Sequence, residues 1–199
     1  MGPVIAAFYD KINQNEALFM RIETVYNSPD KKTLNPEQQR LVWKYYHDFV
    51  YYGAKMNDEN KKKVAEINQK LASLNTKFSQ NLLADEGLFL ELNEKEAGSL
   101  PADVKDAAAQ MAKDKNKTGW LIANTRSSIE PFLTYCNDRS LREKAWKMFI
   151  NRGDNGNATD NNGLITEILA LRAERAKLLG FPTHAHWRLS NKMAKTPDK

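Results

Sequence analysis

The chain has 199 residues, 41% of them hydrophobic and 28% charged, with a formal net charge of +5 and a pI near 9.1. This composition is ordinary for a soluble globular protein, and no stretch reaches the roughly 18 to 20 apolar residues that a membrane helix needs. Lysines and arginines alternate with acidic residues outside the triplet Lys61 to Lys63, which argues against a nucleic-acid partner. The start Met1-Gly-Pro lacks the layout of a secretion signal, so we expect a cytoplasmic protein without a membrane partner.

The first third of the chain has helical spacing. An apolar stripe begins almost at the first residue, and a second one follows Asn15, a plausible helix cap. The residues of the two stripes are Val4, Ile5, Phe8, Ile12, Leu18, Phe19, Ile22, Val25 and Tyr26. Asn35-Pro36-Glu37-Gln38 then predicts a capped helix start, and Gly53 can take the left-handed conformation that ends the same helix.

A long helix is predicted from near Asn57 onward. Its apolar residues recur every three or four positions: Val64, Ile67, Leu71, Leu74, Phe78 and Leu82. At 1.5 Å per residue this segment gives a helix on the order of 40 Å long.

The period changes in the middle of the chain. Residues 87–93 and 119–125 are short, rich in β-forming side chains and bounded by Gly and Asn, whereas residues 101–113 between them are Ala-rich and helical. We therefore expect two antiparallel strands flanking a small helix.

Helical spacing returns in the last third. One helix is expected behind Asp138, a second from Leu164 to the stop at Gly180-Phe-Pro, and a short one over residues 183–191. The predicted fold is mainly α, with antiparallel helical layers and one small β-hairpin. Because no low-complexity linker or repeat interrupts the pattern, residues 1–199 are expected to form a single helical unit.

The sequence predicts no catalytic, cofactor-binding or metal-binding residue in this chain. Its single cysteine, Cys136, excludes an intrachain disulfide and is expected to be a small apolar residue beside Tyr135. His184 and His186 stand two positions apart, so on a helix they point about 200° away from each other, and His47 lies far upstream. A helical zinc pair instead needs two ligands four positions apart and a third ligand elsewhere.

The loop over residues 153–163 is rich in oxygen ligands and superficially resembles a calcium loop. Counting from Asp154 as the first ligand places Gly156 at the third position and Thr159 where the glycine should be, and no carboxylate closes the loop. We expect a turn followed by a helix start that Asp160 or Asn161 caps.

An aromatic set lies on the helix over residues 36–52: Trp43, Tyr45, Tyr46, Phe49, Tyr51 and Tyr52. Such a set could form a peptide-binding platform, but Tyr45, Phe49 and Tyr52 share one side of the helix, so most of the set is expected in the core or between helices.

Several runs carry a resemblance to a known family. They are residues 34–42, 48–50 with 53–54, 74–79 with 81–83, 131–135 with 137–142, 151–154, 171–181 and 193–197, so that nearly the whole chain is covered. In order and spacing these runs resemble the peptidyl-dipeptidases (dipeptidyl carboxypeptidases) of the thimet oligopeptidase-like zinc metallopeptidases. The catalytic His-Glu-x-x-His of that family is absent, because no His here is followed by Glu.

The resemblance implies that this chain is a non-catalytic portion of a hydrolase that carries out proteolysis. The parent would use zinc to release dipeptides from peptide C-termini, with this chain walling the substrate channel and the missing C-terminal catalytic domain as its partner. The amides of residues 153–163 would face that channel. A signal on a longer parent would make the parent periplasmic or exported instead of cytoplasmic. The alternative is a free-standing helical module that binds peptides or proteins without catalysis.

An excised piece should expose apolar faces. We expect them at Val4, Ile5 and Phe8 and at Trp187 and Leu189. Self-association of the chain is expected to bury these faces.

Overall fold

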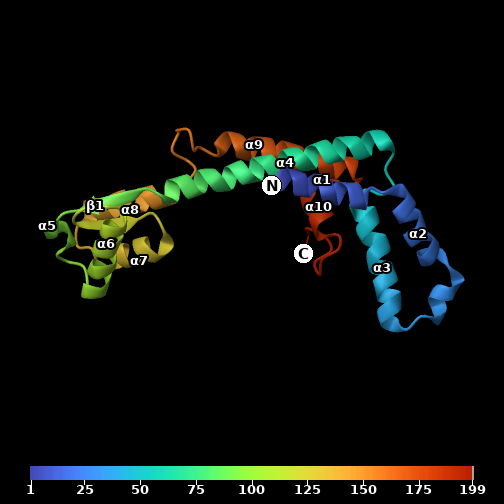
Figure 1. The fold of residues 1–199 in the computed structure, drawn as a ribbon, viewed down its shortest axis with the longest axis horizontal. Coiled ribbons are helices and arrows are strands. Elements are labelled where there is room, and N and C mark those ends of the chain that lie inside the picture. Colours follow the sequence, from blue (N-terminus) through green and yellow to red (C-terminus); the bar gives the residue numbers. More distant parts are fainter. Residues whose placement is uncertain (199) are drawn as a thin grey trace. The chain divides into compact units, whose positions relative to one another are not determined.

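The computed structural model describes residues 1–198 (Figure 1). Its elements, in chain order, are α1 (Gly2–Asn13), α2 (Glu16–Asn27), the 3₁₀ helix η1 (Pro29–Thr33), α3 (Pro36–Tyr51), α4 (Asp58–Glu86), β1 (Phe89–Leu92), α5 (Glu94–Ala97), α6 (Ala102–Asp114), β2 (Trp120–Ala123), α7 (Arg126–Tyr135), α8 (Arg139–Ile150), α9 (Asn162–Leu178) and α10 (His184–Leu189). The predicted mainly α fold with one antiparallel hairpin is confirmed.

The contacts divide the chain into two compact units. Unit 1 comprises residues 1–76 and the segment from Ile165 onward, and unit 2 comprises residues 77–164. Helices α4 and α9 each contribute to both units. That residues 1–199 form one helical unit stays a prediction.

Unit 1 begins with helices whose ends follow the predicted capping signals. The Asn15 side chain accepts a hydrogen bond from the Leu18 N–H at 2.8 Å, and Asn35 and Gln38 form a reciprocal capping box. Gly53 ends α3 with a φ of +94°, the left-handed conformation predicted for it. These local devices fix where α2 and α3 begin and end, so that their apolar faces meet around Phe19 and Phe49.

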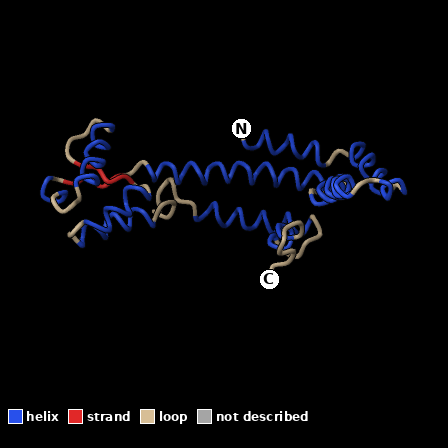
Figure 2. The backbone as a smooth tube through the Cα atoms, turned by 90° about the horizontal axis from the view of Figure 1, so that it is seen from below, coloured by secondary structure: helices blue, strands red, loops and turns tan. Residues whose placement is uncertain are grey.

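Within unit 1, α4 lies between α1 and α9 (Figure 2). The long apolar stripe of α4 packs against α9 around Ile67, Leu71 and Ile168. Hydrogen bonds from α4 also reach α1, because Asn68 Nδ2 donates to Asp10 Oδ1 at 2.7 Å. The three helices are therefore tied by apolar packing on one side of α4 and by a polar contact on another.

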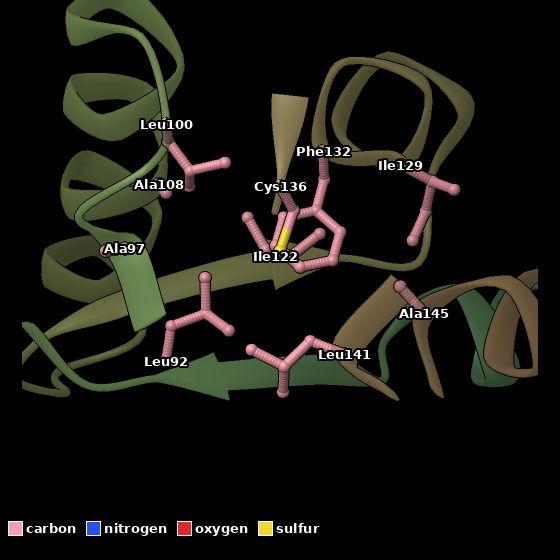
Figure 3. Packing of buried hydrophobic residues seen from close by; sticks show 10 residues of the cluster. All are labelled: Leu92, Ala97, Leu100, Ala108, Ile122, Ile129, Phe132, Cys136, Leu141 and Ala145. Atoms are coloured by element: carbon pink, nitrogen blue, oxygen red, sulfur yellow. The ribbon is translucent and has the colours of Figure 1, made fainter. Parts of the chain in front are cut away.

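Unit 2 contains the two strands, drawn in red in Figure 2. They pair antiparallel, with Phe89 opposite Ala123 and Leu92 opposite Trp120. The core of unit 2 gathers side chains from the hairpin and from α5 to α8 (Figure 3). Phe132 of α7 and Ala145 of α8 are 0% exposed in it, so helix α7 is one of its main walls.

Some elements differ from the sequence expectation. The strands are shorter than 87–93 and 119–125, because Asn93 leaves β1 to cap α5 in a capping box with Glu96, and Asn124 turns inward after β2. The patterns do not predict α5, η1 or α7. The last of these carries Pro131 inside the helix, a residue that ordinarily signals a break.

The expected exposure of the two apolar faces is half right. Val4, Ile5 and Phe8 are 75%, 51% and 59% exposed, as predicted. Trp187 is instead buried, because its ring stacks on Tyr51 with centroids 4.8 Å apart and its Nε1 donates to the Tyr51 carbonyl at 3.2 Å.

In residues 1–198, no helix combines the length and apolarity that crossing a membrane requires. The cytoplasmic location stays a prediction.

Candidate functional site

The loop over residues 153–163 is fastened to Asp85 of α4. The Asp85 carboxylate accepts hydrogen bonds from the Gly153 N–H (2.7 Å), the Asn155 side-chain amide (2.9 Å) and the Thr159 hydroxyl (2.7 Å). Gly153 has a φ of +74°, and an added Cβ would lie 2.8 Å from the side chain of Asn161. The turn therefore needs glycine at this position both for its backbone conformation and for space.

The hydrogen bonds decide the charge state of Asp85. Burial of this carboxyl, which is 3% exposed, would raise its pKa, but the bonds from Gly153, Thr159 and Asn155 outweigh that effect and lower the pKa below 3.8. Asp85 is thus an ionised, buried anchor of the loop at neutral pH.

The remaining oxygens of the loop also accept hydrogen bonds within it. Asp160 accepts from the N–H groups of Gly156 and Asn162, each at 2.8 Å, and Asp154 accepts from the Asn162 side chain at 2.7 Å. The Asp160 contact to Asn162 caps α9, so the expected turn and capped helix start are confirmed. The Asn161 side chain bonds to α4 instead. It is 1% exposed, and its Oδ1 accepts from Asn81 at 2.9 Å.

The three histidines do not form a metal site. His47 Nδ1 lies 2.8 Å from the Trp43 carbonyl, and His186 Nδ1 lies 2.8 Å from the Thr183 hydroxyl. The Nδ1 atom of His184 is buried beside Trp187 without a partner. Burial and the charges of Arg175, Arg172 and Arg188 lower the pKa of His184. Among residues 1–198, no group of three or more His, Cys, Asp or Glu side chains could hold a metal ion.

Cys136 lies in the core of unit 2 at 3% exposure, where Figure 3 places it close to Ile122 and Phe132. Its Sγ contacts only the Asp138 carbonyl, at 3.7 Å, among the hydrogen-bonding groups of the described chain. The expected role as a small apolar residue is confirmed.

The aromatic set of α3 is less buried than expected. Phe49 and Tyr51 belong to the core and Tyr46 is half-buried, but Trp43, Tyr45 and Tyr52 are exposed. Tyr46 stacks on Tyr26 of α2 with ring centroids 3.8 Å apart, so three of the six side chains lie in the core or between helices, the placement predicted for most of them. The other three are exposed, and Tyr45 and Tyr52 among them line a pocket of unit 1.

This pocket has a volume of about 560 Å³. Tyr45, Phe49 and Tyr52 of α3 line it on one side, and Tyr9 of α1 and Trp187 of α10 line it elsewhere. Pockets of this size with largely aromatic walls are the usual places where proteins bind small ligands.

Three polar side chains from three helices also line the pocket. Asp10 Oδ1 accepts from Asn68 Nδ2, and Asn68 Oδ1 accepts from Arg175 Nη1, both at 2.7 Å. Burial raises the pKa of Asp10 against the lowering effects of Asn68 and Arg175, and burial also lowers the pKa of Arg175. The buried atoms Asp10 Oδ2 and Arg175 Nε have no hydrogen-bond partner within residues 1–198.

Sequence reasoning missed Asp85, Asn68, Asp10 and Arg175. A signal existed for Asp85, because it stands three positions after Leu82 on the apolar stripe of α4, where a carboxylate is out of place. Asn68 and Arg175 carried the same signal, because Asn68 stands between Val64 and Leu71 and Arg175 between Leu171 and Leu178 at helical spacing.

Comparisons with known proteins extend over nearly the whole chain. Residues 132–199 match the family described as Peptidase family M3. A dipeptidyl carboxypeptidase of Salmonella typhimurium is 32% identical over 197 residues, which are 97% of this chain and 29% of the relative. An oligopeptidase A of Haemophilus influenzae is 31% identical over 99% of this chain and 30% of its own length.

A plant relative shows a similar identity and a similar coverage of this chain. The organellar oligopeptidase A of Arabidopsis thaliana is 31% identical over 96% of this chain and 25% of its own length. The chain thus spans about 30% of the length of the bacterial relatives that it matches.

Proposed function

Because this chain is a relative of the family M3 peptidases, the thimet oligopeptidase-like enzymes, we propose that it is the non-catalytic helical portion of a zinc metallopeptidase that releases dipeptides from peptide C-termini. The missing catalytic domain is its partner in this proposal, and peptides are the substrates of the whole protein.

The observation that carries the proposal is the extent of the match. Nearly all of the chain, 97%, aligns with the dipeptidyl carboxypeptidase of Salmonella typhimurium, yet it accounts for only 29% of that relative. A module that had evolved a different function would be expected to lose its similarity to the peptidase in part of its length. The similarity instead covers 97% of this chain.

Within residues 1–198, the histidines do not gather with other His, Cys, Asp or Glu side chains into a group of three or more that could hold zinc. Zinc is therefore assigned to the remainder of the parent protein, and none of the catalytic steps is assigned to this chain.

A role in walling a substrate channel is supported by the build of unit 1. Its helices combine stable cores with accessible aromatic side chains, among them Tyr45, Tyr52 and Tyr9, which are 53%, 41% and 58% exposed. Aromatic side chains contact extended peptides at low cost in side-chain entropy.

The experiment compares two proteins, the chain alone and the longest reading frame that contains it. We expect the long protein to carry a downstream His-Glu-x-x-His, to bind one zinc and to release C-terminal dipeptides from an N-terminally blocked peptide until a chelator is added. Replacing the Glu of that motif by Gln is the matched control for activity. The chain alone is expected to bind substoichiometric zinc after dialysis and to release no dipeptide.

Zinc at one per chain with chelator-sensitive dipeptide release by the chain alone would overturn the proposal. A reading frame that stops directly after Lys199 would favour the alternative, a free-standing helical module that binds peptides or proteins. The pocket of unit 1 is the feature that favours this alternative, because it offers a binding site within residues 1–198.

A further inference from the structure

The pocket of unit 1 joins apolar walls to a positively charged end. Trp187 forms that end, and two guanidinium groups lie against its ring. Arg175 Cζ is 4.5 Å and Arg188 Cζ is 5.7 Å from the ring centroid, and the His184 ring is 5.5 Å away. One indole therefore gathers two fixed cations and a histidine in a small volume.

These cations lack an acidic partner. Within residues 1–198, neither Arg175 nor Arg188 forms an ion pair with a carboxylate. Asp10 attracts Arg175 through its charge but is bridged to it by the Asn68 amide, and the other carboxylate of the pocket, Asp48, pairs with Lys44. Asp10 therefore offsets part of the charge of Arg175, the arginine that lines the pocket, without forming an ion pair with it.

Two hydrogen-bonding atoms of the pocket residues are also unused. Arg175 Nε is a donor without an acceptor, and Asp10 Oδ2 is an acceptor without a donor. Both residues line the pocket, and both atoms are buried. Buried polar groups that stay unpaired are unfavourable, so a ligand that pairs them gains affinity.

We propose that this pocket binds the C-terminal end of a peptide that has an apolar last residue. The carboxylate pairs with Arg175, the apolar side chain lies between Phe49, Tyr52 and Trp187, and the amide N–H of the same residue donates to Asp10. This assignment rests on the proposed function for its ligand class. A phosphate would satisfy the guanidinium but leave the aromatic walls empty, and a cationic ligand would leave Arg175 Nε without an acceptor.

The charge argument agrees with the titration of Arg175. Burial lowers its pKa, and the neighbouring charges of Arg172 and Arg188 lower it further. An anionic ligand reverses both influences, because a paired guanidinium is less costly to bury than an isolated one.

The test is calorimetric titration of the purified chain with N-acetyl-phenylalanine and with N-acetyl-phenylalanine amide, which differ only in the carboxylate. We expect saturable binding of one acid per chain, at least tenfold tighter than the amide, and weakened by added salt because the interaction is ionic. Equal binding of acid and amide, or no saturable binding of either, overturns the proposal. So does equally tight binding of inorganic phosphate or of phenylalanine amide.

Variants locate the binding residue. Arg175→Gln should abolish the preference for the acid, and Arg175→Lys should keep part of it. Arg21→Gln is the matched control, since Arg21 is an exposed arginine of unit 1 outside the pocket. The comparison of acid with amide on the unchanged chain stands even if an Arg175 variant fails to fold. Failure of this binding proposal can be told apart from failure of the proposed function, because the proposed function is measured as zinc-dependent activity of the long protein.

Discussion

Asp85 and Gly153 lie 68 residues apart in the sequence, and the Gly153 N–H donates a hydrogen bond of 2.7 Å to Asp85 Oδ2. Two side chains of the same loop, Asn155 and Thr159, donate to the same carboxylate. One buried charge of α4 thus holds the segment that connects α8 to α9. The charge and the hydrogen bonds that it accepts have testable consequences for stability.

Replacing Asp85 by Asn is expected to destabilise the fold by about 2 to 4 kcal/mol, because the charge is lost and an amide NH₂ then faces hydrogen-bond donors. Urea unfolding followed by circular dichroism measures the change. Asp106→Asn is the matched control, since it removes a carboxylate from an exposed position of α6. Equal midpoints for the two variants would contradict the anchoring role of Asp85.

The Asp85 contribution should also depend on pH. The hydrogen bonds lower its pKa in the folded state below 3.8 despite its burial. A lowered folded-state pKa means that the stabilisation is complete above the unfolded-state pKa and is lost as the pH falls through the folded-state value. The stability difference between the unchanged chain and Asp85→Asn is therefore expected to be constant between about pH 5 and 7 and to shrink below about pH 3.8. A difference that grows on acidification would refute this linkage.

Asn124 gives a second test in unit 2. It is 0% exposed, and its side-chain amide donates to the carbonyls of Asp85 (2.9 Å) and Met148 (3.0 Å). Asn124→Ala leaves both carbonyls without this donor, at an expected cost of about 2 to 4 kcal/mol in urea unfolding. The exposed Asn75→Ala on α4 should be neutral or slightly stabilising, because alanine is the better helix former. A similarly small effect for both variants would show that the Asn124 contacts contribute little.

Trp187 offers a graded pair of variants in unit 1. Trp187→Ala removes a buried ring that stacks on Tyr51 and should cost about 3 to 5 kcal/mol. Trp187→Phe keeps an aromatic ring but loses the hydrogen bond to the Tyr51 carbonyl, at about 1 to 2 kcal/mol. Thermal and urea unfolding measure both, with Trp146→Ala, 48% exposed on α8, as the control. Should the control prove as costly as Trp187→Ala, the burial of Trp187 would not be what stabilises unit 1.

The features that the sequence predicted correctly are local. Asn15, Asn35 and Asp138 cap helices through bonds that span two or three residues, so their pattern is visible without the fold. The hairpin was also predicted from local signals, because each strand is a short run of β-forming side chains bounded by Gly and Asn rather than a run with helical spacing.

The features that it missed depend on distant partners. Arg175 bonds to a residue 107 positions away, and Trp187 bonds to one 136 positions away. The expected exposure of Trp187 was wrong because its partner, Tyr51, belongs to a helix that periodicity cannot bring next to it. The pocket was missed likewise, since five separate helices line it.

The last prediction concerns α1. Val4, Ile5 and Phe8 are 75%, 51% and 59% exposed, and they follow one another at the spacing of a single helical face. Burial of apolar surface returns roughly 25 cal/mol per Å², so two chains that cover these faces gain stability by associating. We expect the mass from light scattering to rise with concentration, and Phe8→Glu to suppress the rise. Tyr135→Glu is the control, because Tyr135 is 49% exposed on α7 of unit 2. If the chain stays monomeric at high concentration, or if the control suppresses association as strongly as Phe8→Glu, the face of α1 is not where the chains meet.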